Sequence, residues 1–406
     1  MDVCYFGFGR RDGLQGPPRI AVTAFKTLRT LSPSQTSQLR RLNTITKPFP
    51  EKLAFAFDID GVLKQGHHNI LPQAKRVLRL LSGADGTLAK PIPFLLMTNG
   101  GGVPDAERRA ALSSELGVEI GENQLVQSHT PVQQHVHRYA DKPVLVIGGT
   151  GEACRRVAES YGLKHAYIPQ DIIAWNPAVW DRTALTTEEE AFVKRGVDFS
   201  QTPLHAIFVL HDTRDWGRDA MIICELLSSK GGVISTQRED RRKQKEGGEI
   251  PLLFTNPDLE WRSDYPLSRF GMGAFRLSVE SIYKATTGLE LPYLQYGKPQ
   301  KATYAFAEEM LRRDMKRLGR DPSAPLNVYM VGDNPESGML FLSYRKRVLV
   351  NAKAFLDIAG ANNHGWNSIL LRTGVYSGGT PTHRPTTIAD DVEMGVLWAI
   401  ERELTR

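Results

Sequence analysis

Cysteine is scarce in this chain, and long apolar runs are absent. The 406 residues include three cysteines, Cys4, Cys154 and Cys224, which lie far apart and form no CxxC pair. This spacing argues against a disulfide framework and a cysteine zinc site, and it is typical of a reducing compartment. No apolar run approaches the roughly 18 residues that a membrane-spanning helix needs. The sequence therefore predicts no transmembrane segment.

Acidic residues are rare in the first fifty residues, which hold two acids against eight Lys and Arg. The net charge of +6 belongs to this leader, because the other 356 residues carry 43 basic and 43 acidic side chains. A neutral body has no broad positive field for a polyanion, which argues against a nucleic-acid partner.

The leader is rich in Arg, Ser and Thr and has no continuous apolar segment. This composition is typical of mitochondrial transit peptides rather than secretory signals. We therefore expect residues 1–50 to be a disordered leader that directs the protein to the mitochondrial matrix and is removed within residues 40–50. The alternative is an N-terminal extension that carries no targeting signal, on a cytoplasmic protein.

The rest of the chain alternates short apolar runs with amphipathic stretches. Helices are predicted at Gln73–Leu81 and Lys301–Leu318. Buried strands are predicted at Leu53–Asp60, Pro93–Thr98, Val144–Gly148, Ala206–His211, Pro251–Thr255, Val328–Gly332 and Ser368–Thr373. This alternation predicts an α/β fold with a doubly wound parallel sheet. Ligands of such sheets bind at the carboxyl ends of the strands, so polar residues directly after these runs are the candidate site residues.

Two other stretches have plainer interpretations. The mixed charges of Gln237–Glu249 are typical of a solvated loop. The glycines of Gly148–Gly151 follow a predicted strand, but GGTG is not the GxGxxG pattern of a dinucleotide-binding loop. Neither stretch predicts a binding site.

A pair of acids ends the first predicted strand. Asp58 and Asp60 lie two residues apart, so their side chains point the same way unless the chain bends between them. A buried carboxylate pair is unfavourable unless a metal or a proton relieves it, and Gly61 permits a sharp turn directly afterwards. Acids and glycine also mark ordinary strand-ending turns, so this motif by itself is weak.

Three further motifs follow predicted strands in the same way. Thr98-Asn99-Gly100-Gly101-Gly102 offers a hydroxyl and backbone N–H groups to an anion. Tyr296-Gly297-Lys298-Pro299 supplies a compact cation in a stiff turn, suited to a phosphate or carboxylate. Gly332-Asp333-Asn334 supplies another carboxylate. Each motif is weak alone, but the four together provide a nucleophile, a second acid, a hydroxyl, a cation and a metal ligand.

This order of DxDG, TNGG, GKP and GDN resembles the haloacid dehalogenase (HAD) superfamily, and more narrowly its subclass IIA with a C2-type cap. Further stretches resemble a mitochondrial branch called cat eye syndrome critical region protein 5-type. They are His211–Gly217, Phe254–Leu259, Arg269–Phe275, Leu294–Thr303 and Asn362–Tyr376. The resemblance covers roughly residues 50–400.

The resemblance implies a Mg²⁺-dependent phosphatase that forms an aspartyl phosphate. It implies that Asp58 is the nucleophile and that Asp60 is the general acid and base. Phosphate would be held by Lys298, by the Thr98 hydroxyl and by the N–H groups of Asn99 and Gly100. The implied Mg²⁺ ligands are Asp58, the Asp60 carbonyl, Asp333 and Asp357.

The resemblance also implies a domain plan. A HAD-like core would comprise 51–135 and 292–406, and an inserted α/β cap would comprise 136–291, since so long a stretch is no loop. Substrate identity is set in the cap, and the sequence does not reveal it. The expected partner is a small phosphorylated metabolite, and a homodimer through the cap stays open.

Two other functions stay open beside the phosphatase. One is a catalytically weak or inactive descendant that binds a metabolite or partner. The other is a soluble role in glycerophospholipid metabolism, because relatives of this branch are sometimes labelled CDP-alcohol phosphatidyltransferases. The chain has neither the DGxxAR motif nor the spanning helices of an integral-membrane transferase.

Residues 338–356 interrupt the acidic-loop pattern of the branch. Removing these 19 residues joins Gly332–Ser337 directly to Asp357–Asn363 and restores the pattern. Codons that contain a splice donor at Gly338-Met339 and an acceptor at Leu356-Asp357 are compatible with the sequence. We therefore infer a retained intron or a faulty gene model. We also expect the insertion to weaken Mg²⁺ binding by keeping Asp357 from Asp333; a genuine surface loop is the alternative.

Overall fold

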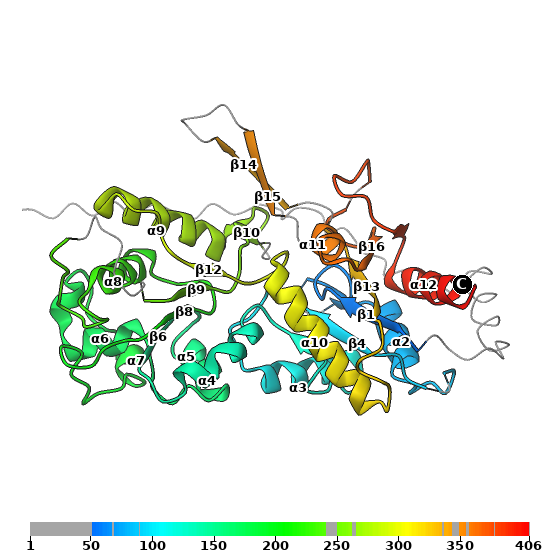
Figure 1. The fold of residues 1–406 in the computed structure, drawn as a ribbon, viewed down its shortest axis with the longest axis horizontal. Helices are drawn as coiled ribbons and strands as arrows, with labels where there is room; N and C mark the ends of the chain where they lie inside the picture. Colours follow the sequence, from blue (N-terminus) through cyan, green and yellow to red (C-terminus); the bar gives the residue numbers. More distant parts are fainter. Residues whose placement is uncertain are drawn as a thin grey trace, which may run out of the picture. The chain divides into compact units, whose positions relative to one another are not determined.

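The computed structural model describes residues 51–66, 69–88, 90–240, 250–261, 265–334, 357–376 and 378–405, and the backbone of 337–342 and 349–354 (Figure 1). The predicted leader therefore lies outside the described residues, as does most of the mixed-charge stretch Gln237–Glu249.

A six-stranded parallel sheet with the order β17-β16-β13-β1-β4-β5 carries the predicted motifs. Its strands are β1 (Leu53–Phe57), β4 (Phe94–Met97), β5 (Leu125–Val126), β13 (Asn327–Gly332), β16 (Asn367–Leu371) and β17 (Thr387–Ala389). Every residue of β1 is buried, as expected for a central parallel strand that is covered on both faces.

Helices cover both faces of this sheet. On one face, Ala54 and Ala56 pack with residues of α10 (Lys301–Arg317) and α11 (Asp357–His364). On the other face, the Phe55 ring contacts the Tyr329 ring, which contacts Trp398 of α12 (Val392–Thr405). Helix α2 (Pro72–Leu81) packs against α12 and starts with a proline, whose fixed φ suits the first helical position.

A second, five-stranded parallel sheet has the order β12-β9-β8-β6-β7. Its strands are β6 (Val144–Ile147), β7 (Ala166–Tyr167), β8 (Ile207–Val209), β9 (Leu252–Phe254) and β12 (Leu294–Gln295). All seven predicted strands are present in the two sheets. The chain is therefore an α/β protein with doubly wound parallel sheets, as predicted.

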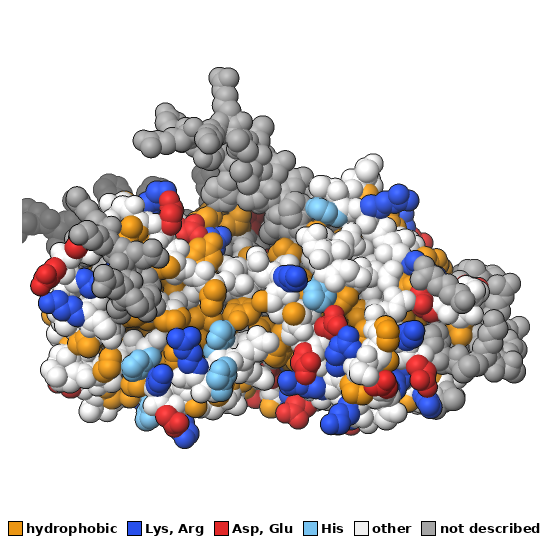
Figure 2. Space-filling view, viewed as in Figure 1, with side chains coloured by type: hydrophobic (Ala, Val, Ile, Leu, Met, Phe, Trp, Pro, Cys, Tyr) orange, Lys and Arg blue, Asp and Glu red, His pale blue; other side chains and the backbone are white. Residues whose placement is uncertain are grey.

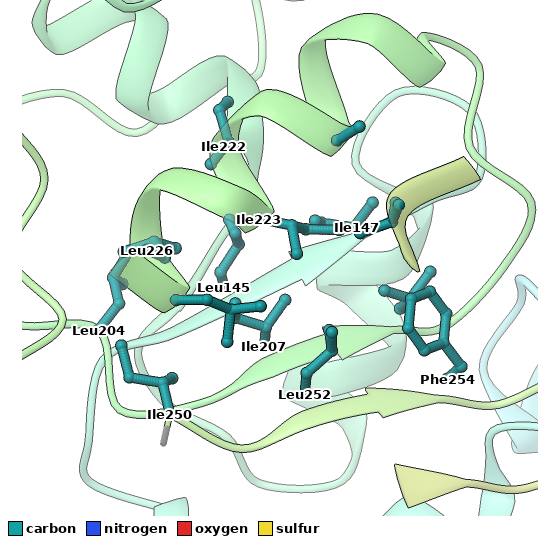
Figure 3. Packing of buried hydrophobic residues seen from close by; sticks show 14 of the residues in the cluster. Leu145, Ile147, Leu204, Ile207, Ile222, Ile223, Leu226, Ile250, Leu252 and Phe254 are labelled. Carbon is teal, nitrogen blue, oxygen red and sulfur yellow. The ribbon is translucent and has the colours of Figure 1, made fainter. Parts of the chain in front are cut away.

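The core of the second sheet lies between its strands and helix α8 (Trp216–Ser228). Figure 3 shows Ile223 and Leu226 of α8 on the side of the helix that faces Leu145 and Ile207 of the strands, whereas Ile222 points away from these strands; all five are buried. Apolar residues at i and i+3 place one helical stripe on the sheet, as an amphipathic helix requires.

The remaining described elements are short hairpins and surface helices. The antiparallel hairpins are β2 (Lys64–Gln65) with β3 (Asn69–Ile70), β10 (Glu260–Trp261) with β11 (Arg269–Phe270), and β14 (Ser337–Leu342) with β15 (Leu349–Ala354). The other helices are α3 (Asp105–Leu116), α4 (Val136–Tyr139), α5 (Ala153–Ser160), α6 (Pro169–Trp175), α7 (Thr187–Glu190) and α9 (Met272–Thr287), with 3₁₀ turns at Thr130–His135 and Pro177–Trp180.

None of the helices in the described part of the chain combines the length and apolar character that a membrane-spanning helix needs. On the face shown in Figure 2, basic and acidic side chains are intermixed among the residues drawn in colour.

The second sheet extends to Gln295, past residue 291, where we placed the end of the cap. The division into separate core and cap domains stays a prediction.

Candidate active site

Three carboxylates from distant parts of the sequence meet at the carboxyl end of the six-stranded sheet. Asp58 follows β1, Asp333 follows β13, and Asp357 is the first residue of α11. Each offers an oxygen within 4.8 Å of the others. All three residues are buried, with between 1% and 8% of each exposed. The parallel order of the sheet places these chain ends at one edge, as the motif positions predicted.

Lys298 lies among these carboxylates. Its Nζ donates to Asp58 Oδ1 at 2.5 Å and to Asp357 Oδ1 at 2.7 Å. The lysine is 3% exposed. Three buried carboxylates therefore share one buried ammonium group. The cluster would carry two excess negative charges if all four groups were ionised.

Burial and the charges of neighbouring groups together shift the pKa values of the cluster. Burial raises the pKa of Asp58 well above its usual range, and the charges of Asp357 and Asp333 add to this while Lys298 opposes it. Burial, followed by the charge of Asp357, raises the pKa of Asp333 to about 6. Burial alone would lower the pKa of Lys298, but Asp357 and Asp58 outweigh it and hold that pKa well above its usual value.

Two glycines hold Asp333 in place. Gly61 has φ +86°, a conformation that residues with a side chain rarely adopt, and a Cβ there would overlap the Asp333 carboxylate. A Cβ on Gly374 would overlap the same carboxylate. The Val375 N–H donates to Asp333 Oδ2 at 2.7 Å. The glycine of the DxDG motif is therefore needed both for the turn and for the close approach of Asp333.

Asp60 does not join the three-carboxylate cluster. Strand β1 ends at Phe57, and the chain turns before Asp60, whose side chain is 64% exposed and lies 3.4 Å from the Lys64 Nζ. We expected Asp58 and Asp60 to point the same way because alternate residues of a strand lie on one face. The strand ends at Phe57, so this alternation does not extend to Asp60. The Asp60 charge is still the smallest of the causes that raise the pKa of Asp58.

Thr98 and Asn99 follow β4 and lie beside the cluster. The Thr98 Oγ1 accepts from the Gly100 N–H at 3.0 Å. The Asn99 side chain pairs with the backbone of Lys298: its Oδ1 accepts from the Lys298 N–H at 2.7 Å, and its Nδ2 donates to the Lys298 carbonyl at 3.1 Å. Asn99 therefore holds the lysine through the peptide group, a contact that the sequence did not reveal.

Two residues after β9 also contact Asn99, and they were missed as site residues. The Asn99 Nδ2 donates to Asp258 Oδ1 at 3.1 Å, and the Asn256 Nδ2 donates to the Asn99 carbonyl at 3.1 Å. Burial raises the pKa of Asp258 to about 6, and the hydrogen bond from Asn99 opposes this rise. The signal was present in Phe254–Leu259, which entered the sequence comparison only as a mark of the branch.

The glycines of Gly148–Gly151 do not form an open anion loop. A Cβ on Gly148 would overlap the His211 backbone, and the Gly149 N–H donates to the Asp212 carbonyl at 2.9 Å. The neighbouring loop after β8 fills the space that a diphosphate would need. This packing agrees with the prediction that Gly148–Gly151 is not a dinucleotide-binding loop.

The expected effect of the insertion on Asp357 is wrong. Strands β14 and β15 pair in register from Ser337 with Ala354 to Leu342 with Leu349, so the two ends of the hairpin lie side by side. Asp357 follows this closed base and still joins Asp58 and Asp333. A hairpin adds residues without separating the residues that flank it. The inference of a retained intron stays a prediction.

The donor set of the cluster fits a hard divalent cation. Three carboxylates with oxygens within 4.8 Å of one another suit Mg²⁺, which prefers oxygen ligands and keeps several waters. The two excess negative charges match one divalent ion. Burial, with the neighbouring carboxylates adding to it, raises the pKa values of Asp58 and Asp333, so a bound cation would favour their ionised forms.

A haloacid dehalogenase-like hydrolase model matches residues 55–164, and a second HAD-like hydrolase model matches residues 355–394. A mitochondrial hydrolase of Saccharomyces cerevisiae is 35% identical over 372 residues, which cover 87% of this chain and 96% of that protein.

A cardiolipin synthase (CMP-forming)/mitochondrial hydrolase fusion protein of Schizosaccharomyces pombe is 38% identical over 356 residues. The match covers 87% of this chain, which therefore spans about half (54%) of the fusion protein.

Solved structures with a similar fold include phosphatases. A p-nitrophenyl phosphatase from Archaeoglobus fulgidus has a TM-score of 0.51 at 15% identity, covering 86% of this chain and 100% of that one. A 4-nitrophenylphosphatase from Thermotoga maritima has a TM-score of 0.51 at 17% identity, covering 86% and 98%. At these identities the likeness shows the fold. The family models and the yeast relative show that the chain belongs to the haloacid dehalogenase superfamily of hydrolases.

Proposed function

We propose that this hydrolase is a Mg²⁺-dependent phosphatase of small phosphate monoesters. The observation that carries the proposal is the cluster of Asp58, Asp333 and Asp357 around Lys298 at the carboxyl end of a parallel sheet. Three buried carboxylates around a single cation carry excess negative charge, which is unfavourable in a purely structural cluster. A bound metal ion would relieve this excess, and an anionic substrate could then bind to the metal ion and the lysine.

The carboxylates of Asp58, Asp333 and Asp357, with the Asp60 carbonyl, would hold Mg²⁺. The bound ion would supply positive charge that lets an anionic nucleophile approach an anionic phosphate. Lys298, the Thr98 hydroxyl and the N–H groups of Asn99 and Gly100 would hold the phosphoryl oxygens. The Gly100 N–H now donates to Thr98 Oγ1, so it would exchange that bond for a phosphate oxygen.

The chemistry proceeds in two steps on the side chains of this protein. An Asp58 oxygen attacks phosphorus, the bond from phosphorus to the ester oxygen breaks, and Asp60 donates a proton to the leaving oxygen. Water then attacks the phosphorus of the aspartyl phosphate, Asp60 accepts a proton from that water, and the bond from phosphorus to the Asp58 oxygen breaks, which releases inorganic phosphate and restores the Asp58 carboxylate. The exposed position of Asp60 suits this exchange of protons with leaving group and water.

Phosphate release from p-nitrophenyl phosphate tests the reaction. Purified protein should release phosphate with Mg²⁺ and stop when EDTA is added. The same assay over a panel of phosphorylated metabolites would define the substrate. If no phosphate is released from any member of the panel, the chain is a metabolite or partner-binding descendant and the proposal fails.

A second candidate function is a role in glycerophospholipid metabolism. The observation that favours it is the fusion of a homologous hydrolase to a cardiolipin synthase in Schizosaccharomyces pombe. The substrate would then be a phosphate monoester carried by a glycerolipid headgroup. Faster phosphate release from such lipids in vesicles than from water-soluble esters would favour this substrate, and the reverse would exclude it.

We also propose that the protein acts in mitochondria. The support is that one yeast relative is a mitochondrial hydrolase and the other contains a mitochondrial hydrolase fused to a cardiolipin synthase. Fractionation of cells, followed by N-terminal sequencing of the mitochondrial protein, tests this. A mature end within residues 40–50 is expected, and full-length protein in the cytosol would overturn the proposal.

A further inference from the structure

Asp105, the first residue of α3, is the acceptor for four side chains in a buried network. Its Oδ1 accepts from Gln127 Nε2 at 2.8 Å and from Thr130 Oγ1 at 3.0 Å. Its Oδ2 accepts from Gln133 Nε2 at 3.1 Å and from the Tyr161 hydroxyl at 2.9 Å. A carboxylate that receives four donors at a helix N-terminus is an acceptor only. The Tyr161 proton therefore points at Asp105.

This orientation determines the tautomer of His129. The His129 Nδ1 lies 2.6 Å from the Tyr161 oxygen, whose own proton goes to Asp105, so Nδ1 must carry the hydrogen. Burial lowers the pKa of His129 to about 4, with Asp105 opposing, and burial raises the pKa of Tyr161 well above its usual value. The imidazole and the phenol are thus neutral, and Nε2 of His129 holds a lone pair.

That lone pair faces the loop proposed to hold phosphate. The His129 ring is fully buried, and Nε2 has no hydrogen-bond partner among the described residues. A Cβ on Gly101 would lie 2.7 Å from His129 Cδ2 and 3.2 Å from Nε2, so the loop backbone packs directly on this edge of the ring. A buried acceptor without a donor is unfavourable. With almost no solvent at Nε2, the N–H groups of the adjoining loop are one source of that donor.

We propose that Asp105, Tyr161 and His129 are positioning residues that order the Thr98–Gly102 loop for phosphate, with His129 Nε2 accepting an N–H of this loop when phosphate binds. The inference rests on the proposed function, because the loop's phosphate contacts are part of it. Tyr161 follows α5 of the second sheet, whereas Asp105 and His129 belong to the first. The network therefore links the position of α5 to the order of the phosphate loop.

Conservative substitutions separate this role from simple packing. Tyr161→Phe removes the hydroxyl and keeps the ring. His129→Leu removes both nitrogens, whereas His129→Gln keeps a donor and an acceptor. Arg156→Gln is the matched control, because the half-exposed ion pair of Arg156 with Glu107 also joins α5 to α3 but does not touch His129. Each variant is measured for KM and kcat with p-nitrophenyl phosphate, for the Kd of inorganic phosphate, and for Tm.

Tyr161→Phe and His129→Leu should raise both KM and the phosphate Kd about tenfold, the size of one lost hydrogen bond. His129→Gln should recover most of the loss, and Arg156→Gln should match wild type. Phosphate affinity that stays unchanged in Tyr161→Phe while Tm falls would overturn the proposal. An equal loss in Arg156→Gln would also overturn it, because docking of α5 alone would then explain the effect.

A measurement that needs neither turnover nor phosphate keeps the test separate from the proposed function. ¹⁵N NMR of histidine-labelled protein, with the His129 signal assigned from His129→Gln, reports which ring nitrogen carries the proton. The expected form in wild type is Nδ1–H, with a changed signal in Tyr161→Phe. A signal from Nε2–H would refute the network even if the enzyme is an active phosphatase. An inactive wild type with the Nδ1–H signal would instead refute the phosphatase and leave the network supported.

Discussion

Two buried clusters of charged side chains, one beside each parallel sheet, differ in how their charges balance. Near the second sheet, Arg155 donates to both oxygens of Asp171 at 2.6 and 2.8 Å, and the N–H groups of Ile168 and Lys194 also donate to Asp171. Beside the first sheet, Lys298 faces three carboxylates. One cluster is a matched pair, and the other has two charges in excess.

This difference distinguishes charged residues that stabilise the fold from charged residues that could bind a ligand. A charge-matched pair whose carboxylate accepts from Arg155 and from two backbone N–H groups is complete within the fold, so it needs no further ligand. Burial raises the pKa of Asp171 as well, but there the hydrogen bonds and Arg155 oppose the shift. In the unmatched cluster burial also raises the pKa values of Asp58 and Asp333, and neighbouring carboxylates add to this shift, so the cluster stays unfavourable until a proton or a cation joins it. We therefore expect mutations in the two clusters to separate stability from activity.

The largest expected effect is the loss of activity in Asp58→Asn. The substitution keeps the shape but removes the nucleophile, so kcat should fall by at least about 10³-fold. Tm without metal should stay the same or rise, because a buried excess charge is removed. Asp171→Asn is the matched control and should keep kcat within a few-fold while lowering Tm. Full turnover by Asp58→Asn would show that the nucleophile is assigned wrongly.

The second prediction concerns stability. Arg155→Met leaves the Asp171 carboxylate buried without its cation, which should lower the free energy of unfolding by about 3–5 kcal/mol. Urea denaturation measures this, and Mg²⁺ affinity should not change. The double variant Arg155→Met/Asp171→Leu should recover most of the lost free energy of unfolding, because it no longer contains an unpaired buried carboxylate. If the single variant is as stable as wild type, the Arg155–Asp171 ion pair does not contribute to the stability of the fold.

The third prediction is a pH dependence of metal binding. The pKa of Asp333 rises from 3.8 to about 6, so the folded chain holds more protons than the unfolded chain between these values. Without metal, this group makes the fold less stable as pH rises through that window. Protons compete with Mg²⁺, so its affinity should fall about tenfold per pH unit for each proton taken up below pH 6.

Tm measured with Mg²⁺ and with EDTA at pH 5.0 and pH 7.5 tests the linkage. The gain in Tm from Mg²⁺ should be larger at pH 7.5. Asp333→Asn should reduce the gain and flatten its pH dependence. A gain that is equal at both pH values would contradict the raised pKa of the cluster.

The smallest effect is expected for deletion of residues 338–356. Because the hairpin closes on itself at Ser337 and Ala354, its removal should leave Asp357 beside Asp333. Mg²⁺ affinity and kcat should then change by no more than about twofold, since a closed insertion costs the flanking chain little. A large gain in activity would revive the view that the insertion disturbs the site.

The retained-intron inference needs a separate experiment. Sequencing of cDNA across this junction should show that most transcripts lack the codons for residues 338–356. Transcripts dominated by those codons would show that the hairpin belongs to the natural protein.

Chain order and local pattern were sufficient for the fold class and for most members of the cluster. Buried apolar runs predicted the seven strands, and the topology of parallel sheets predicted that Asp58, Thr98 and Asp333 would gather at one edge. Such features depend on residues within one strand and the turn that follows it. Lys298 was predicted as a site residue from its motif, but it follows β12 of the second sheet, so its place in the cluster depends on packing. Asp60 is a second exception, because its direction depends on where β1 ends and on the turn at Gly61.

Only the tertiary structure revealed the contacts between distant segments. Asn99 pairs with Lys298 and Asp258, which are 199 and 159 residues away, and Asp105 receives Tyr161 from 56 residues away. Local periodicity carries no information about such pairs, because they depend on how whole sheets and loops pack. The sequence by itself therefore determined which chemical groups lie at the strand ends. Packing determined which of these groups are buried with excess charge, and so where we propose that a cation and a phosphate bind.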